Sequence, residues 1–371
     1  LAAVLIARVC WLVVPQERRQ AASTLAIGMG ALALGTPWVL VVGSLAYNEP
    51  AVLLLGAGAM LAALSTTAPS LARWSIAAFL VGSACGAKPT ALFMVGPVVG
   101  ALLVATTPPR ALVKPLVVGC AVGVLTLLPW LVRNEVATGN PVFPQLSGVF
   151  GQGHWTAEQH ARWARGHAFD GSAFDRVRLL LLPDPSGPFL GGTSMRGVLH
   201  PQWGLLGALS LIAVLVAPLL QRRAFVLALA VGAVAQLAAW LLLTHLQSRF
   251  LLPIVLTGSP LLAVALARFG RVGVWIAIGL ALAQVGWGAW TYAGERGGKP
   301  GLAIAPGVAI FTGEVEPQAS PTGVVNFGLP DVPGRVLLVG DAAPLYCLAD
   351  PLYTTTWDAG VLVGALEAHR G

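Results

Sequence analysis

The sequence is dominated by long apolar runs that carry almost no charge. A helix needs about 20 mostly apolar residues to cross the hydrocarbon core of a membrane. Ten runs approach this length, although Arg8 interrupts the first: 1–14, 24–45, 50–65, 72–87, 90–107, 113–132, 203–220, 224–244, 249–267 and 271–291. Because a helix satisfies its own backbone hydrogen bonds in lipid, these runs predict an all-α polytopic membrane protein with about ten transmembrane helices.

Composition excludes two other classes of protein. Of the 371 residues, 56% are hydrophobic and 10% are charged, whereas an average soluble protein has about 25% charged residues. So few charged residues cannot cover the surface of a soluble globular protein. A disordered chain is also excluded, because it would be rich in charge and poor in apolar residues. No carboxylate lies in the middle of a run, which counts against an ion-coupled transporter because such proteins use intramembrane acids.

The cations indicate how the runs are oriented. Alternate short loops contain nine Lys and Arg residues, whereas the loops between them contain only Lys88 and Arg249. The nine are Arg18, Arg19, Arg73, Arg110, Lys114, Arg222, Arg223, Arg268 and Arg271. Since cytoplasmic loops are rich in Lys and Arg, we predict a multi-pass protein of the inner (cytoplasmic) membrane, with the polar segments 133–202 and 292–371 outside the cytoplasm. The net charge of +7 is then mainly an orientation signal, and no nucleic-acid partner is predicted.

A few polar residues lie at the predicted outer ends of the runs. The cations among them depart from the excess of Lys and Arg in the predicted cytoplasmic loops. Glu49 lies in a short turn, and the cations Lys88, Arg133 and Arg249 occupy the same predicted depth. Arg and Lys pair well with phosphate, so the group predicts a site for an anionic headgroup. The alternative is that each cation simply extends to the membrane interface.

Five segments, in order, resemble membrane glycosyltransferases of the GT-C superfamily, which are related to protein O-mannosyltransferases and lipid A aminoarabinose transferases. Residues 129–144 read P-W-L-V-R-N-E-V-A-T-G-N-P-V-F-P, similar to the signature PW-x-x-RN-x-x-x-TGNP-[VI]-[FY]-P. The other four segments are G-T-P-W-V-L-V-V-G-S-L-A-Y-N-E-P at 35–50, G-S-A-C-G-A-K-P-T-A-L at 82–92, H-L-Q-S-R-F-L-L-P at 245–253 and R-V-L-L-V-G-D-A-A-P-L-Y at 335–346.

The resemblance implies an enzyme that moves a sugar from a polyprenyl-phosphate donor to a lipid, glycan or protein acceptor on the extracytoplasmic side. It implies that Lys88 and Arg249 bind the donor phosphate, together with Arg133 and with Asn134 and Tyr47 as further substrate-binding residues. The partners would be this donor and membrane lipids.

The resemblance also implies where the acidic residues that take part in the reaction lie. Glu49 matches a secondary acidic position, whereas the principal acid of the family lies in a first outer loop, which would be upstream of Leu1. We therefore expect the chain to be N-terminally truncated. No cofactor is predicted, and His154, His160 and His167 lack a metal-ligand spacing.

The polar segments carry their own signals. Thr156-Ala157-Glu158-Gln159 is a capping box that predicts a short helix through Arg165, which we interpret as an interfacial helix acting either as a mobile lid or as a static cover. Residues 335–340 and 352–357 read as strands and predict a small C-terminal α/β extracytoplasmic domain at 293–371, after the transmembrane domain at 1–292.

Two other functions remain open. A transporter or flippase of lipid-linked material would need cations along a continuous path across the membrane, whereas here they stop at the outer end. A non-catalytic membrane protein of envelope assembly would lack the upstream acid.

Overall fold

The computed structural model of the chain describes residues 1–44, 47–169, 171–181, 203–220, 223–295, 335–338 and 350–353. The chain divides into two compact units. The first comprises 1–131 and 169–300, and the second comprises 132–168 and 301–371. Each unit is described by itself.

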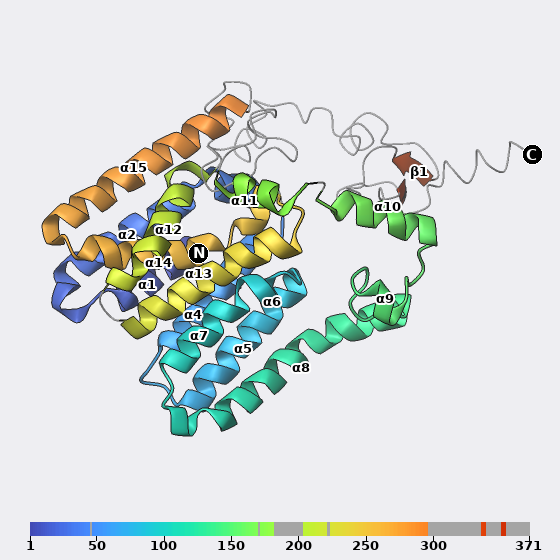
Figure 1. Cartoon of the computed structure of the whole chain (residues 1–371), viewed down its shortest axis with the longest axis horizontal. Helices are drawn as coiled ribbons and strands as arrows, with labels where there is room; N and C mark the ends of the chain where they lie inside the picture. Colours follow the sequence, from blue (N-terminus) through green and yellow to red (C-terminus); the bar gives the residue numbers. More distant parts are fainter. Residues whose placement is uncertain are drawn as a thin grey trace, which may run out of the picture. The chain divides into compact units, whose positions relative to one another are not determined.

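The described part of the first unit is helical (Figure 1). Its N-terminal part contains α1 (Ala2–Val13), η1 (Gln16–Arg18), α2 (Arg19–Leu34), α3 (Pro37–Ser44), α4 (Glu49–Leu64), α5 (Ser70–Ala87), α6 (Ala91–Met94), α7 (Gly96–Ala105), η2 (Pro109–Ala111) and the first part of α8 (Val113–Thr138). Its second part contains α11 (Ala173–Leu181), α12 (Gly204–Val216), η4 (Ala217–Leu219), α13 (Arg223–Leu243), η5 (Ser248–Leu251), α14 (Ile254–Ala267) and α15 (Gly270–Glu295).

Four helices in the described residues are long and apolar enough to cross a membrane: α5, α8, α13 and α15. Six shorter apolar helices accompany them, at Ala2–Val13, Gln20–Leu34, Glu49–Leu64, Ala91–Ala105, Gly204–Leu219 and Ile254–Ala267. The prediction of a mostly helical, membrane-type protein is therefore confirmed. Each predicted apolar run forms helix, but only four of the ten reach full spanning length.

Prolines explain why three of the predicted runs are interrupted. The run 24–45 forms α2 and α3, which are separated at Gly35 and Thr36, just before Pro37. The run 90–107 breaks at Val95, before Pro97, and the run 249–267 begins as a 3-10 turn that ends before Pro253. Proline has no N–H and its ring clashes with the preceding turn, so a helix ends or restarts there.

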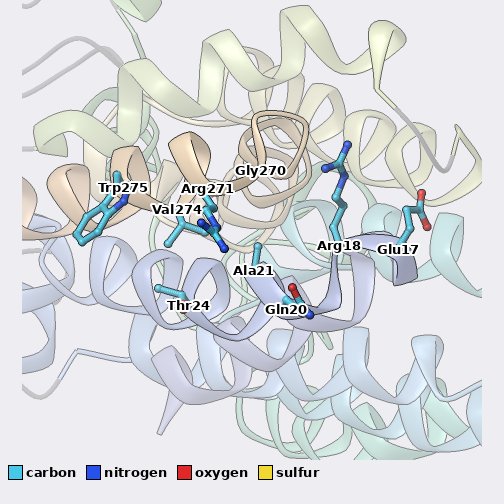
Figure 2. Close-up of a pocket in the computed structure, with 9 residues that line it drawn as sticks. All are labelled: Glu17, Arg18, Gln20, Ala21, Thr24, Gly270, Arg271, Val274 and Trp275. Atoms are coloured by element: carbon cyan, nitrogen blue, oxygen red, sulfur yellow. The ribbon is translucent and has the colours of Figure 1, made fainter.

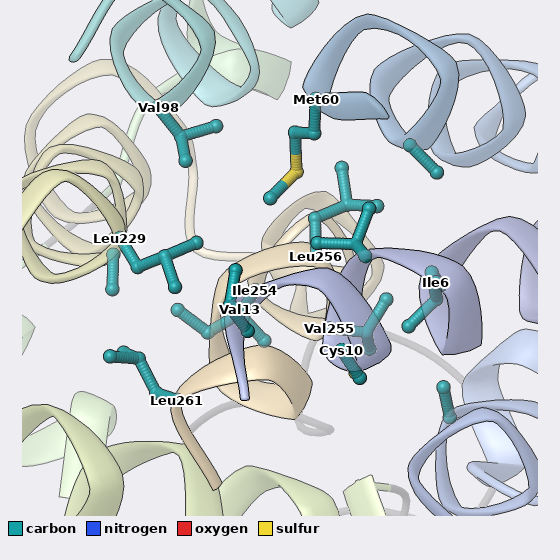
Figure 3. Packing of buried hydrophobic residues seen from close by; sticks show 14 of the residues in the cluster. Ile6, Cys10, Val13, Met60, Val98, Leu229, Ile254, Val255, Leu256 and Leu261 are labelled. Carbon is teal, nitrogen blue, oxygen red and sulfur yellow. The ribbon is translucent and has the colours of Figure 1, made fainter. Parts of the chain in front are cut away.

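Helix α14 forms the centre of the first unit. Every residue of this helix except Ala265 is buried, as expected for a helix that is apolar on all sides. It packs against α1, α2, α12 and α13 (Figure 1). Figure 3 shows its Ile254, Val255 and Leu256 among side chains from α1 and α4.

Small residues allow the helices around α14 to approach closely. A Cβ atom at Gly258 would lie 2.0 Å from Ser210 Oγ of α12, and one at Gly232 would lie 2.3 Å from Val98 Cβ of α7. Neither position has room for a side chain. Such contacts let backbones pack tightly where lipid provides no hydrophobic force between helices.

A buried amide compensates for the breaks at the prolines. Gln236 of α13 donates through Nε2 to the carbonyl oxygens of Met94 (2.7 Å) and Pro253 (3.1 Å). Its Oε1 accepts a 2.7 Å hydrogen bond from Thr257 Oγ1. Carbonyls at the C-terminal end of a helix have no intrahelical partner, so Gln236 supplies one for Met94 at the end of α6. The Pro253 carbonyl also accepts from the Leu256 N–H (2.9 Å), so Gln236 adds a second donor to it.

The described part of the second unit contains the end of α8, α9 (Ser147–Phe150), α10 (Ala157–His167) and the strands β1 (Arg335–Leu338) and β2 (Asp350–Tyr353). The strands pair in parallel, with Arg335 opposite Asp350. The strand predicted at 335–340 is confirmed over β1, and β2 begins two residues before the predicted 352. The remaining residues between 296 and 371 lie outside the described part of the chain.

Helix α10 confirms the predicted capping box. Thr156 Oγ1 accepts from the Gln159 backbone N–H (3.2 Å), and Gln159 Oε1 accepts from the Thr156 N–H (2.7 Å). Trp155, just before the helix, contacts the rings of Phe143 and Trp163 at centroid distances of 4.7 and 6.0 Å. The helix start is therefore held both by hydrogen bonds and by an aromatic cluster.

Candidate anion-binding site

The site begins where α5 ends and α4 starts. Asn48 Nδ2 donates a 2.7 Å hydrogen bond to the carbonyl oxygen of Ala87, so the two helix ends are tied together. Glu49 is the first residue of α4, and Lys88 follows the last residue of α5. A carboxylate at a helix N-terminus and a cation at a C-terminus both interact favourably with the helix dipoles. The extended backbone of Lys88 (φ −155°) fits its place before Pro89.

Lys88 and Glu49 form a mostly buried ion pair. Lys88 Nζ lies 2.5 Å from Glu49 Oε1, and the side chains are 15% and 5% exposed, respectively. Glu49 Oε2 is also buried and has no hydrogen-bond partner among the described residues. One carboxylate oxygen therefore holds the lysine, while the other remains available as an acceptor.

A turn between α13 and α14 positions Arg249. Leu246 in this turn is fully buried and adopts a left-handed backbone conformation (φ 64°), which is unfavourable for a residue with a Cβ atom. Its N–H donates to Thr244 Oγ1 (3.1 Å), and Trp240 Nε1 donates to the Gln247 carbonyl oxygen (2.8 Å). The surrounding contacts thus impose a strained turn directly before Arg249, a feature that is common at functional sites.

Aromatic rings hold the two cations in place. The Arg249 guanidinium carbon lies 4.8 Å from the centroid of the Tyr47 ring and 5.3 Å from that of Phe250. Lys88 Nζ lies 4.2 Å from the same Phe250 centroid. Cations are attracted to ring faces, so Phe250 brings the two positive charges together. Within the described residues Arg249 forms no ion pair, and its buried Nε has no hydrogen-bond partner.

The site therefore contains two cations and one carboxylate. Burial lowers the pKa of Lys88, and the nearby Arg249 charge lowers it further, whereas Glu49 raises it by attraction and hydrogen bonding. An additional negative group would relieve the repulsion between Lys88 and Arg249. The electrostatics of the site thus favour an anion.

The cavity beside these groups is small. It has a volume of about 10 Å³ and is lined by Glu49, Val52, Lys88, Thr90, Arg249, Phe250, Leu252 and Pro253. This is room for about one water molecule. A phosphate group therefore enters only if lining side chains move.

The structure brings together four of the six residues predicted for the site: Tyr47, Glu49, Lys88 and Arg249, all in the first unit. Arg133 and Asn134 belong to the second unit, where Arg133 is exposed. Asn134 Nδ2 donates to the carbonyl oxygen of Pro141 (3.4 Å), in the loop after α8.

Two residues that shape these regions were not predicted from the sequence. Phe250, the ring shared by both cations, immediately follows Arg249, and an aromatic residue beside a cation was the available signal. Asn140 is fully buried and organises its own loop: its Nδ2 donates to the carbonyl oxygens of Gln145 (2.9 Å) and Gly151 (3.1 Å). In the 129–144 segment this Asn is therefore a loop-forming residue.

Comparison of the chain with protein-family models, with characterised proteins and with solved structures finds no match.

Proposed function

We propose that the protein is a membrane glycosyltransferase that moves a sugar from a polyprenyl-phosphate donor to a lipid, glycan or protein acceptor on the extracytoplasmic side of the inner membrane. The observation that carries the proposal is the meeting of Lys88 and Arg249 over Phe250, beside Glu49. The resemblance of the surrounding segments to GT-C enzymes supports the same activity.

The proposed reaction needs mainly charge neutralisation. The bond between the anomeric carbon and the phosphate oxygen breaks, and polyprenyl phosphate leaves with the bonding electron pair. The acceptor hydroxyl oxygen forms the new bond to the anomeric carbon, and its proton passes to a base. Because the leaving phosphate gains negative charge, cations fixed beside it stabilise the transition state more than the ground state. Lys88 and Arg249 are the groups proposed for this role.

Glu49 has a distinct role in the proposal. Its Oε1 holds Lys88 at 2.5 Å, and its buried Oε2 has no partner in the described residues. Oε2 is therefore available to accept a hydrogen bond from a hydroxyl of the sugar or of the acceptor. Entry of a phosphate would let Lys88 share its three N–H donors between the carboxylate and the anion.

The test is sugar transfer by the protein expressed from its whole gene and reconstituted in liposomes. The donors are a panel of synthetic polyprenyl-phosphate hexoses and pentoses, and the acceptors are extracted envelope lipids, glycans and proteins. We expect Lys88→Ala and Arg249→Ala each to lower the transfer rate by about a hundredfold or more. The matched control is Arg110→Ala, an exposed arginine of η2, which should keep the wild-type rate.

Two results would overturn the proposal. The first is no transfer by the wild type from any donor of the panel, and the second is wild-type transfer by both Lys88→Ala and Arg249→Ala. Retention of each variant in the membrane fraction and an unchanged gel-filtration profile separate loss of chemistry from loss of fold.

A further inference from the structure

A second and much larger cavity lies in the first unit, between the start of α2 and the start of α15 (Figure 2). Its volume is about 620 Å³, and it is lined by Glu17, Arg18, Gln20, Ala21, Thr24, Gly270, Arg271, Val274 and Trp275. Small-molecule sites have typical volumes of about 300–1,000 Å³. The cavity is therefore large enough for a polar headgroup, which the cavity at Lys88 is not.

The polar part of the cavity is positive. Arg18 and Arg271 are both exposed, and the side chain of neither forms an ion pair or hydrogen bond within the described part of the chain. Arg18 Nη1 lies 3.8 Å from the position that a Cβ atom at Gly270 would occupy, so its guanidinium lies against the start of α15. Glu17 lies at the Arg18 end of the cavity, well away from Arg271 (Figure 2). The arginines are thus free to pair with an external anion.

Neutral donors and acceptors lie between the two cations. Gln20 and Thr24, both on α2, line the cavity together with Ala21. The first turns of α2 and α15 contain no acidic residue, so no carboxylate of either helix competes there for the arginines. These groups suit a phosphate that carries a hydroxylated substituent.

The other side of the cavity is apolar and open to the surroundings of the helix bundle. Val274 and Trp275 of α15 line it, and Trp275 is 72% exposed. Phe269 and Val272, which flank Arg271 in sequence, are each 62% exposed. Helix α15 is one of the four helices of spanning length, and Trp is enriched where a membrane helix meets the headgroup layer. A ligand of this cavity thus meets both cations and a lipid-facing surface.

We propose that this cavity binds the headgroup of an anionic membrane phospholipid. The phosphate lies between Arg18 and Arg271, the headgroup hydroxyls contact Gln20 and Thr24, and the acyl chains run along Val274 and Trp275. Cationic pockets between membrane helices are suited to such headgroups. The site is independent of the proposed sugar transfer, because it shares no residue with the Lys88 site.

The experiment compares lipids retained by the purified protein in native mass spectrometry. The protein is extracted from nanodiscs containing equal amounts of phosphatidylglycerol and phosphatidylcholine with matched acyl chains. We expect the wild type to retain phosphatidylglycerol selectively, and Arg18→Gln/Arg271→Gln to lower this retention by about tenfold or more, because the variant removes both charge-assisted contacts to the phosphate. The matched control Arg110→Gln removes an exposed arginine that does not line the cavity and should retain the lipid as the wild type does.

A second arm separates a lipid from a soluble phosphate compound. Glycerol 1-phosphate, added in large excess, should not displace phosphatidylglycerol, and Trp275→Ala should lower lipid retention. Displacement by glycerol 1-phosphate would overturn the lipid assignment in favour of a soluble ligand. Equal retention of both lipids by the wild type, or undiminished selectivity in the double variant, would overturn the site itself. Both arginines are exposed, so the double variant should keep the wild-type melting temperature.

Discussion

Lys88 Nζ lies 2.5 Å from Glu49 Oε1, and this ion pair joins the end of α5 to the start of α4. Two charges removed from water need each other, because the loss of one leaves the other desolvated and unpaired. The pair therefore determines both where Lys88 lies and how stable this end of the bundle is.

Loss of one partner of this ion pair should destabilise the protein more than loss of both partners together. We expect Glu49→Gln and Lys88→Met each to lower the free energy of unfolding by about 3–5 kcal/mol, as is typical when one partner of a buried pair is lost. The double variant Glu49→Gln/Lys88→Met should lose clearly less than the sum of the two single variants. Equilibrium unfolding in mixed micelles measures all three, and additive losses would show that the two groups do not interact.

The contact between Gly258 and Ser210 should make α14 intolerant of a side chain at Gly258. A Cβ atom there would lie 2.0 Å from Ser210 Oγ and 2.6 Å from Ser210 Cβ. We expect Gly258→Ala to lower the free energy of unfolding by about 1–3 kcal/mol through overpacking, and Ser210→Gly to restore part of it in the double variant.

The matched control for this contact is Gly279→Ala on α15, where a Cβ atom would meet nothing within 4 Å. Alanine is the better helix former by about 1 kcal/mol, so this variant should be as stable as the wild type or more stable. Equal behaviour of Gly258→Ala and Gly279→Ala in the same unfolding assay would contradict the close packing of α12 and α14.

The capping box at Thr156 should control the stability of α10. Thr156→Ala removes the acceptor for the Gln159 N–H, and loss of such a cap typically costs about 1 kcal/mol. We expect hydrogen exchange of the first-turn amides of α10 to accelerate by roughly fivefold, whereas Thr156→Ser, which keeps the hydroxyl, should exchange at the wild-type rate. Unchanged exchange in Thr156→Ala would mean that the aromatic contacts of Trp155 alone hold the helix start.

The start of α11 should weaken in acid. Asp175 Oδ2 accepts hydrogen bonds from the Ser172 hydroxyl (2.7 Å) and backbone N–H (2.9 Å), and these bonds lower the pKa of the Asp175 carboxyl below its ordinary value of 3.8. The stabilisation is therefore fully present above that ordinary value and is lost as the pH falls through the lowered pKa. Hydrogen exchange at the start of α11, measured against pH, should accelerate in this range.

Asp175→Asn is the control for this titration. It keeps an acceptor oxygen at the same place but does not ionise, so its exchange rates, corrected for intrinsic chemistry, should not change over the same pH range. A pH dependence that persists in Asp175→Asn would assign the effect to another group.

Much of the local structure could be predicted from the sequence because its causes are local. The apolar runs form helices, the Thr156–Gln159 capping box begins α10, and the strand at 335–338 forms as expected. Glu49 and Lys88 could be assigned to helix ends because a proline follows each of them. The interruptions before Pro37 and Pro97 also have local causes. They were not predicted, because hydropathy averaged over a long segment shows one continuous apolar run across each proline.

What a linear pattern cannot determine is which helix ends meet. Arg249 is far from Glu49 and Lys88 in sequence, and it joins them only because α13, the buried turn at Leu246 and the amide of Gln236 hold η5 in place. The sharing of Phe250 by both cations has the same origin, since a ring-face contact depends on packing over a few ångströms.

The sequence by itself determined that this is a mostly helical, membrane-type protein, because apolar length and sparse charge follow directly from residue type. It also singled out Lys88 and Arg249, because they depart from the charge bias of the other short loops. Only the tertiary structure decided that these two cations share one ring, that one of them pairs with Glu49, and that Arg18 and Arg271 line a second cavity. The sequence pattern of a helix indicates which of its faces are apolar. A site forms between helices, and the mutual placement of helices depends on close packing.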